Sequence, residues 1–217
     1  MEECSLLIEN TTVMTDAETI QTGMDIAVCG EKIAAVVKHG EREFQAKKVI
    51  SGKEKLIMPG LIDSHMHTGQ QLLKGLVLDV KPIIWTRVML PFESTLTSEK
   101  MQLSAKAAAL EMIKSGTSGF VDAGSYFMEA AAEVYVQSGL RGCLSFSTMD
   151  EEGLPESIAM DAVQAVKETD TLYEHWNRQG NLKVYYSLRA LNSCSDKLTE
   201  LAAEHAGDRG AMLQAHM

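Results

Sequence analysis

The feature that most constrains the fold is a change of pattern at Pro59–Gly60. Downstream of it, short apolar runs alternate with amphipathic segments of helical period: LIDSHMH, then TSEKMQLSAKAAALEMIKSG, then GFVDAG, and so on to AMLQAHM. Strands separated by helices of this length are typical of parallel β/α units. Residues 59–217 are therefore predicted to form a parallel α/β fold, in which we count about five strand–helix starts.

The segment upstream of this change has a different character. Residues 1–58 consist of short β-type runs separated by turn residues, which predicts a small all-β module. Within it, DIAVCGEKIAAVV is predicted to be a hairpin that turns at Gly30–Glu31, because glycine supplies the backbone freedom that such a turn needs. A closed (β/α)₈ barrel needs eight strands and about 250 residues. The sheet over residues 59–217 is thus expected to be open, or the chain incomplete.

Several helix ends are marked by capping residues. Thr97 or Ser98 is predicted to cap the helix that runs to Lys114, and Gly116 stands where a left-handed residue ends a helix. Ser195 is a similar N-cap, and Gly207 is predicted to end the helix that follows it.

Composition and charge exclude several classes of protein. Of the 217 residues 45% are hydrophobic, which is enough for a globular core. The formal net charge is −10, so an extended basic surface for nucleic acid is not expected. No apolar stretch approaches the roughly 18 residues of a membrane span, and the first residues are acidic, unlike a signal peptide. The four cysteines are far apart, as in a reduced protein, and we predict a cytoplasmic location.

The strongest local motif for chemistry is PGLIDSHMH. Alternate residues of a strand share a face, so His65 and His67 project the same way, with Asp63 just below them. Two imidazoles at this spacing can bind one metal ion, zinc or iron, and Asp63 can orient the ligands from the second shell. The alternative is two half-buried strand histidines that solvent or backbone carbonyls satisfy.

The longer string LIMPGLIDSHMH, after a small β module, resembles the first barrel strand of the amidohydrolase superfamily. The segment that continues to GFVDAG is similar to the aminohydrolase branch that contains methylthioadenosine/S-adenosylhomocysteine deaminases and chlorotriazine hydrolases. This resemblance implies a (β/α)₈ barrel preceded by part of a small β-sandwich domain, and a catalytic metal bound by His65 and His67. AMLQAHM resembles the fifth barrel strand of the family, which makes His216 the third predicted ligand.

The resemblance also implies parts that these residues do not contain: a proton-shuttling glutamate, a sixth-strand histidine and an eighth-strand aspartate. We therefore expect a chain truncated after strand five, with no catalytic residue of its own and inactive by itself. Binuclear members carry a carboxylated lysine on the fourth strand, where this chain has Ser187, Leu188 and Arg189, so one divalent ion is expected. The alternative is a non-catalytic remnant, or one half of a split assembly whose partner chain supplies the remaining strands.

The same resemblance suggests substrate-binding residues. Trp85 and Glu93 match positions that line the pocket of nucleoside-deaminating members, where the glutamate accepts hydrogen bonds from ribose. Arg189 replaces a base-contacting histidine, as in guanine deaminases, and can donate to a ring nitrogen or carbonyl; the alternative is a structural ion pair. The expected function is hydrolytic deamination or dehalogenation of an N-heterocycle such as a purine, a purine nucleoside or a triazine. No nucleic acid or membrane partner is expected, and the complete form is expected to be a homo-oligomer.

Overall fold

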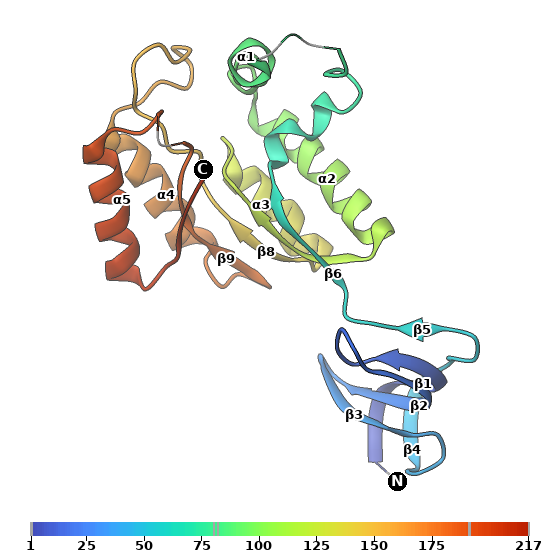
Figure 1. The fold of residues 1–217 in the computed structure, drawn as a ribbon. Helices are drawn as coiled ribbons and strands as arrows, with labels where there is room; N and C mark the ends of the chain where they lie inside the picture. The colour runs from blue at the N-terminus through green and yellow to red at the C-terminus, as the bar shows by residue number, and fades with distance from the viewer. Residues whose placement is uncertain (1, 80, 82, 191, 217) are drawn as a thin grey trace. The chain divides into compact units, whose positions relative to one another are not determined.

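The structure, a computed structural model, describes residues 2–79, 81, 83–190 and 192–216 (Figure 1). The chain separates into two units, Met1–Gly60 and Leu61–Met217. The first unit is a single sheet of five strands: β1 (Glu2–Met14), β2 (Ile20–Cys29), β3 (Lys32–Lys38), β4 (Phe44–Ser51) and β5 (Leu56–Ile57). The strand order is β3-β2-β1-β4, and β5 also pairs with β1. Strands β2 and β3 pair antiparallel, and Gly30 between them has a φ of +61°. The predicted hairpin is confirmed.

The second unit contains a row of parallel strands. In order, it consists of β6 (Leu61–Met66), β7 (Thr117–Asp122), β8 (Arg141–Leu144) and β9 (Leu182–Val184), followed by the paired strands β10 (Tyr186–Leu188) and β11 (Leu213–Ala215). The predicted single strand over NLKVYYSLR is therefore two short strands separated by Tyr185. A parallel bridge between Thr148 and Leu188 continues the row across this break. The row thus has about five strand positions, as the alternation of the sequence predicts.

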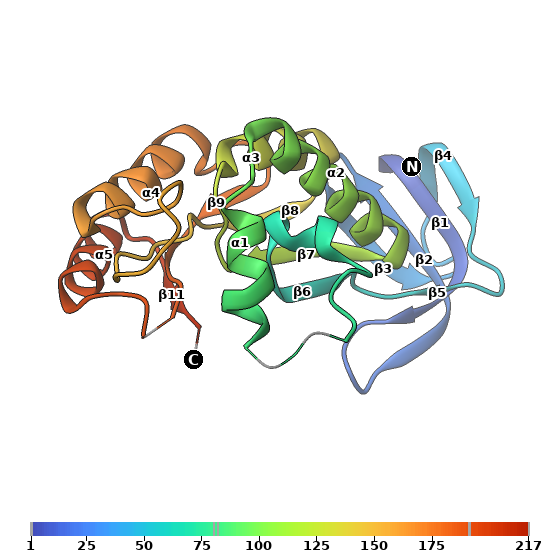
Figure 2. The same cartoon turned by 90° about the horizontal axis from the view of Figure 1, so that it is seen from above.

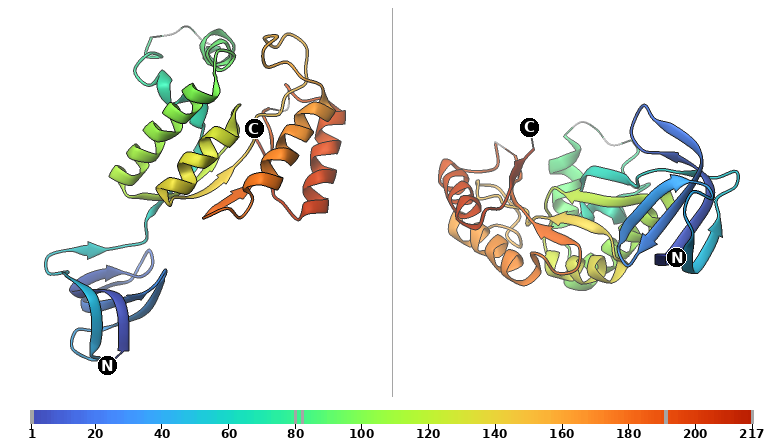
Figure 3. Two further views of the ribbon diagram at one scale, coloured as in Figure 1. Left: turned by 180° about the vertical axis from the view of Figure 1, so that it is seen from behind. Right: turned by 90° about the horizontal axis from the view of Figure 1, so that it is seen from below.

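Four long helices lie along the outside of this row, side by side in chain order (Figures 2 and 3). They are α2 (Ser98–Ser115), α3 (Met128–Ser138), α4 (Ala162–Trp176) and α5 (Asp196–Arg209). Helix α2 buries Met101, Ala105, Ala108 and Met112, whose spacing places them on one face. Shorter turns connect β6 to α2: a 3₁₀ segment η1 (Thr68–Leu73), a π-helical turn η2 (Trp85–Met89) and α1 (Leu90–Glu93). No helix of the described residues is long and apolar enough to cross a membrane.

Most of the predicted helix ends are confirmed. The Thr97 hydroxyl accepts the Lys100 N–H at 3.3 Å at the start of α2, and Gly116 ends this helix with a φ of +80°. The Ser195 hydroxyl accepts the Leu198 N–H at 3.1 Å at the start of α5. The prediction that Gly207 ends α5 is wrong, because the helix continues to Arg209. Gly210, with a φ of +60°, adopts the left-handed conformation that ends it.

Candidate metal centre and adjoining pocket

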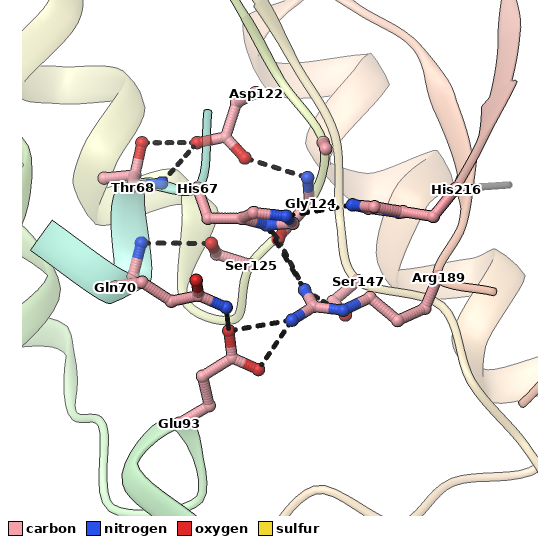
Figure 4. Close-up of polar contacts among 12 residues, drawn as sticks. His67, Thr68, Gln70, Glu93, Asp122, Gly124, Ser125, Ser147, Arg189 and His216 are labelled. Carbon is pink, nitrogen blue, oxygen red and sulfur yellow. Dashed lines mark hydrogen bonds and ion pairs between the residues drawn. The ribbon is translucent and has the colours of Figure 1, made fainter. Parts of the chain in front are cut away.

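Three histidines from the two ends of the strand row meet at its carboxyl edge. His65 lies on β6, His67 follows that strand, and His216 follows β11. Their candidate ligand nitrogens all lie within 4.8 Å of one another, and the Nε2 atoms of His67 and His216 are 2.9 Å apart (Figure 4). Among the residues that the structure describes, no other group of three or more metal-binding side chains is found. The structure therefore brings together the three residues that the sequence analysis selects.

The ring of His67 is oriented by a backbone carbonyl. Its Nδ1 lies 3.0 Å from the Gly124 oxygen, and because a carbonyl only accepts, Nδ1 carries the proton in this contact. The lone pair of Nε2 is then left free on the side of His216. Gly124 itself has a φ of +111°, and a Cβ there would lie 3.1 Å from both the Phe146 oxygen and the Ser147 Cα. Only glycine fits this position without strain.

Burial and a neighbouring cation keep the rings of His67 and His216 neutral. Burial, followed by the charge of the Arg189 guanidinium, lowers the pKa of His67 to about 3. Burial, followed by Arg189, also lowers the pKa of His216 below its usual value. Both imidazoles therefore have a lone pair available at neutral pH, as metal ligands require.

The donor set fits a zinc-sized ion. Two nitrogens bound to one tetrahedral zinc lie roughly 3.3 Å apart, and here one pair of nitrogens is 2.9 Å apart and no pair is more than 4.8 Å apart. Imidazole nitrogens suit both zinc and iron. Asp63 takes a supporting position, since its carboxylate accepts the backbone N–H of His65 at 3.2 Å. Its contact is thus to the backbone beside a ligand and not to a histidine ring; the roles of these four residues stay predictions.

A pocket of about 360 Å³ adjoins the histidines. Its walls include His67, Gln70, Trp85, Met89, Arg189 and His216. Trp85 therefore lies on the wall of a cavity next to two of the histidines, and its role as a substrate contact stays a prediction. A lining that combines an indole and a thioether with polar side chains suits a flat ring with polar edges.

Glu93 and Arg189, predicted as separate substrate contacts, bind each other. The Arg189 Nη2 lies 3.0 and 3.2 Å from the two carboxylate oxygens of Glu93, and their side chains are 3% and 0% exposed. Gln70 donates to the same carboxylate at 2.7 Å. The other guanidinium nitrogen, Nη1, donates to the Gly124 oxygen at 3.1 Å and lies 3.4 Å from the Ser147 hydroxyl. The structural ion pair weighed for Arg189 is therefore present, and the direct substrate roles of both residues stay predictions.

Sequence reasoning missed three residues of this site. Gln70 lies three positions after His67, a spacing that could have drawn attention to it. Asp122 and Gly124 lie in the predicted strand GFVDAG. Their roles in the site, however, depend on contacts with residues more than fifty positions away in the sequence. No local pattern signals such contacts.

Comparison with known proteins supports the resemblance. The model of the amidohydrolase family matches residues 56–217. A 5-methylthioadenosine/S-adenosylhomocysteine deaminase from Caldanaerobacter subterraneus subsp. tengcongensis is 30% identical to the chain over 219 residues, which cover 98% of this chain and 48% of that protein. The chain thus spans about half the length of the curated relatives it matches.

Solved structures with the same fold show what the strand row belongs to. A zinc-bound adenosine deaminase from Xanthomonas campestris superposes with a TM-score of 0.91 at 22% identity, over 100% of this chain and 50% of that one. A zinc-bound atrazine chlorohydrolase from Arthrobacter aurescens superposes with a TM-score of 0.87 at 20% identity, over 98% of this chain and 52% of that one. At such identities the likeness concerns the fold alone. It confirms the prediction of an incomplete α/β barrel.

Proposed function

The chain belongs to the amidohydrolase family, and from this premise we propose that it forms the metal-binding part of a hydrolase acting on N-heterocycles. The reaction replaces an exocyclic amino group, or a halogen, on the ring by a hydroxyl derived from water. The observation that carries the proposal is the convergence of His65, His67 and His216 within 4.8 Å beside a 360 Å³ pocket. Relatives that are about 30% identical over 98% of the chain are named deaminases of adenosine derivatives, which supports the same reaction class.

One divalent ion is proposed at the three histidines, zinc with iron as the alternative. When bound there, such an ion lowers the pKa of a water molecule and so supplies the nucleophile. The residues of this chain hold the ion and orient the ring. His67 contributes Nε2 because Gly124 holds its Nδ1 proton, while Trp85 offers a flat apolar face to the substrate. No carboxylate of the described residues joins the histidine group, so we propose that the catalytic base lies outside those residues.

The ion pair in the pocket favours a free heterocyclic base over a nucleoside. Both oxygens of Glu93 are already within hydrogen-bonding distance of Arg189, and one also accepts from Gln70. A ribose diol would have to displace a buried charge pair to reach this carboxylate, which is costly. The Arg189 guanidinium is a donor that suits ring nitrogens and exocyclic oxygens, and the Gln70 carbonyl is an acceptor that suits a ring N–H or an exocyclic amino group. We therefore propose a purine base or a triazine as the substrate class.

Location and assembly follow the same proposal. Cys4, Cys29, Cys143 and Cys194 are all free thiols, which favours a reducing compartment, and we propose the cytoplasm. A homo-oligomer is proposed for the complete form, without nucleic acid or membrane partners. The acidic net charge of −10 supports the absence of a nucleic-acid partner.

The test is ammonia or chloride release by the zinc-loaded protein purified from its own source. Guanine, an amino- or chlorotriazine and adenosine are supplied as separate substrates. We expect turnover of a base or a triazine in preference to adenosine, and a loss of at least about 100-fold in His67→Ala and His216→Ala. His175→Ala is the control, because this exposed histidine pairs with Glu129 away from the site. Full activity in both ligand variants would overturn the proposal.

A further inference from the structure

A fully buried carboxylate lies behind the metal ligands, at the end of β7. Asp122 is 0% exposed and accepts three hydrogen bonds (Figure 4). One comes from the backbone N–H of Thr68 at 2.9 Å, one from the Thr68 hydroxyl, and one from the backbone N–H of Gly124 at 2.8 Å. Isolated buried carboxylates are costly, and this one is stabilised entirely by these neighbours.

The two residues that Asp122 binds are the two that position His67. Thr68 is the next residue in the chain, so the bond from Asp122 to its backbone N–H fixes the backbone beside His67, just after β6. Gly124 presents the carbonyl that accepts the Nδ1 proton of His67 at 3.0 Å. One carboxylate therefore fixes both the backbone and the ring-orienting carbonyl of a predicted ligand.

Contacts around this carboxylate extend to the other end of the strand row. The side chain of Gln214, on β11 two residues before His216, donates to the backbone oxygen of Asp122 at 2.9 Å. The Thr68 hydroxyl also contacts the Tyr135 hydroxyl at 2.7 Å, and the Thr68 carbonyl accepts the Ser104 hydroxyl at 2.5 Å. Strand β6 and strand β11 thus both contact Asp122, the last residue of β7.

We propose that Asp122 is the positioning residue of the metal centre: through Thr68 and Gly124 it sets the orientation of the His67 imidazole and, with it, the affinity of the three-histidine site. The inference rests on the proposed function, because it assumes that His65, His67 and His216 bind a metal ion. Partners that orient metal ligands typically change metal affinity by roughly 10- to 100-fold when they are replaced.

The test uses cobalt(II) as a spectroscopic probe of the site. We expect wild-type protein to bind about one equivalent with visible d–d bands, since three histidines form the site. Asp122→Asn keeps the size of the side chain but places an amide N–H₂ against backbone donors. It is expected to weaken cobalt affinity by roughly 10- to 100-fold and to shift the d–d bands.

Asp25→Asn is the matched control. Asp25 is also buried and accepts backbone N–H groups, from Asn10 at 2.9 Å and Gly40 at 3.2 Å, but it lies in the first unit. Its replacement should lower the melting temperature and leave the cobalt spectrum and affinity unchanged. A purely structural role for Asp122 predicts the same behaviour for both variants.

A second pair of variants covers the case in which Asp122→Asn does not fold. Thr68→Val removes the hydroxyl that Asp122 accepts and should weaken cobalt binding, while Thr68→Ser keeps the hydroxyl and should restore it. Wild-type affinity in a folded Asp122→Asn, or in Thr68→Val, would overturn the inference alone. Wild-type protein that binds no cobalt would overturn the metal centre, and the inference with it.

Discussion

The Arg189–Glu93 ion pair joins two buried charges beside the pocket. Both side chains are nearly inaccessible, at 3% and 0% exposure. Removing charges of this kind from water costs several kcal/mol, which mutual attraction and further hydrogen bonds offset. Gln70, Ser147 and the Gly124 carbonyl provide those further bonds. The pair is therefore stable only as a unit.

Replacing one partner should destabilise the protein more than replacing both. Arg189→Met leaves Glu93 buried without a counter-charge and is expected to lower the free energy of unfolding by about 3–5 kcal/mol. Adding Glu93→Gln removes the second charge and should recover most of that loss. Urea denaturation of the two single variants and the double variant measures the coupling. Strictly additive losses would contradict this account.

A pH dependence follows from Asp122. Burial raises the pKa of its carboxyl to about 6, although hydrogen bonds from Thr68 and Gly124 act in the opposite direction. The folded chain therefore holds this proton at pH values where the unfolded chain has lost it, so the contribution of Asp122 to stability falls as pH rises from about 4 to about 6.

The Asp122→Asn variant lacks this titration. In chelator-treated protein, the free energy of unfolding of the wild type minus that of the variant should fall by about 3 kcal/mol between about pH 4 and about pH 7. Urea denaturation at several pH values measures it. A difference that does not change with pH would show that Asp122 titrates normally.

For single residues, the sequence predicts only contacts and orientations that depend on neighbouring positions in the chain. The alternation of a strand places His65 and His67 on one face, and a resemblance to a family adds His216. That Arg189 faces Glu93, 96 positions away, follows from no periodicity. Hydrogen-bond partners such as Gln70 and Asp122 depend on which loops meet at the end of the row, and that is decided by tertiary packing.

At the scale of elements, helices α2 and α5 each begin at a side chain that replaces a missing backbone partner. Thr97 caps α2 and Ser195 caps α5, each by accepting an N–H three residues later. The Asp150 carboxylate adds a bond from the Ser195 backbone N–H at 2.7 Å, which ties α5 to the segment after β8.

The cap of α2 can be tested by a conservative series. Thr97→Ala removes the acceptor for the Lys100 N–H and should lower the free energy of unfolding by about 1 kcal/mol. Thr97→Ser keeps the hydroxyl and should remain within a few tenths of a kcal/mol of the wild type. Thermal unfolding followed by circular dichroism compares the three proteins. Equal stability of the alanine variant would mean that the cap contributes nothing.

The end of a helix was predictable from the sequence where a single glycine could adopt the left-handed conformation that ends it. Gly116 ends α2 because only glycine readily takes its left-handed conformation. In α5, Gly207 stays helical and Gly210 ends the helix, and residue type alone does not distinguish the two glycines. The break at Tyr185 was equally hidden, since its neighbours on both sides are apolar strand formers.

At the scale of the whole molecule, the strand row is open. Strand β6 pairs with β7 on one side, and Leu61 and Ile62 on it are 51% and 72% exposed. The relatives of the chain are about twice its length. An apolar strand edge with unpaired backbone groups is a template for association.

We therefore expect a protein of these 217 residues to self-associate through β6. Ile62→Lys places a charge on the edge and should shift the sedimentation profile towards the monomer. Leu78→Lys is the control, because Leu78 is 81% exposed but lies outside every strand. The same profile for both variants would contradict association through this edge.

The central claim is that His65, His67 and His216 bind one metal ion, and anomalous diffraction at the zinc edge tests it most directly. Crystals of the protein with one equivalent of zinc should show one strong anomalous peak, within about 2.0–2.3 Å of a nitrogen from each of the three histidines. A peak at any other place, or none at the three rings, would contradict the account.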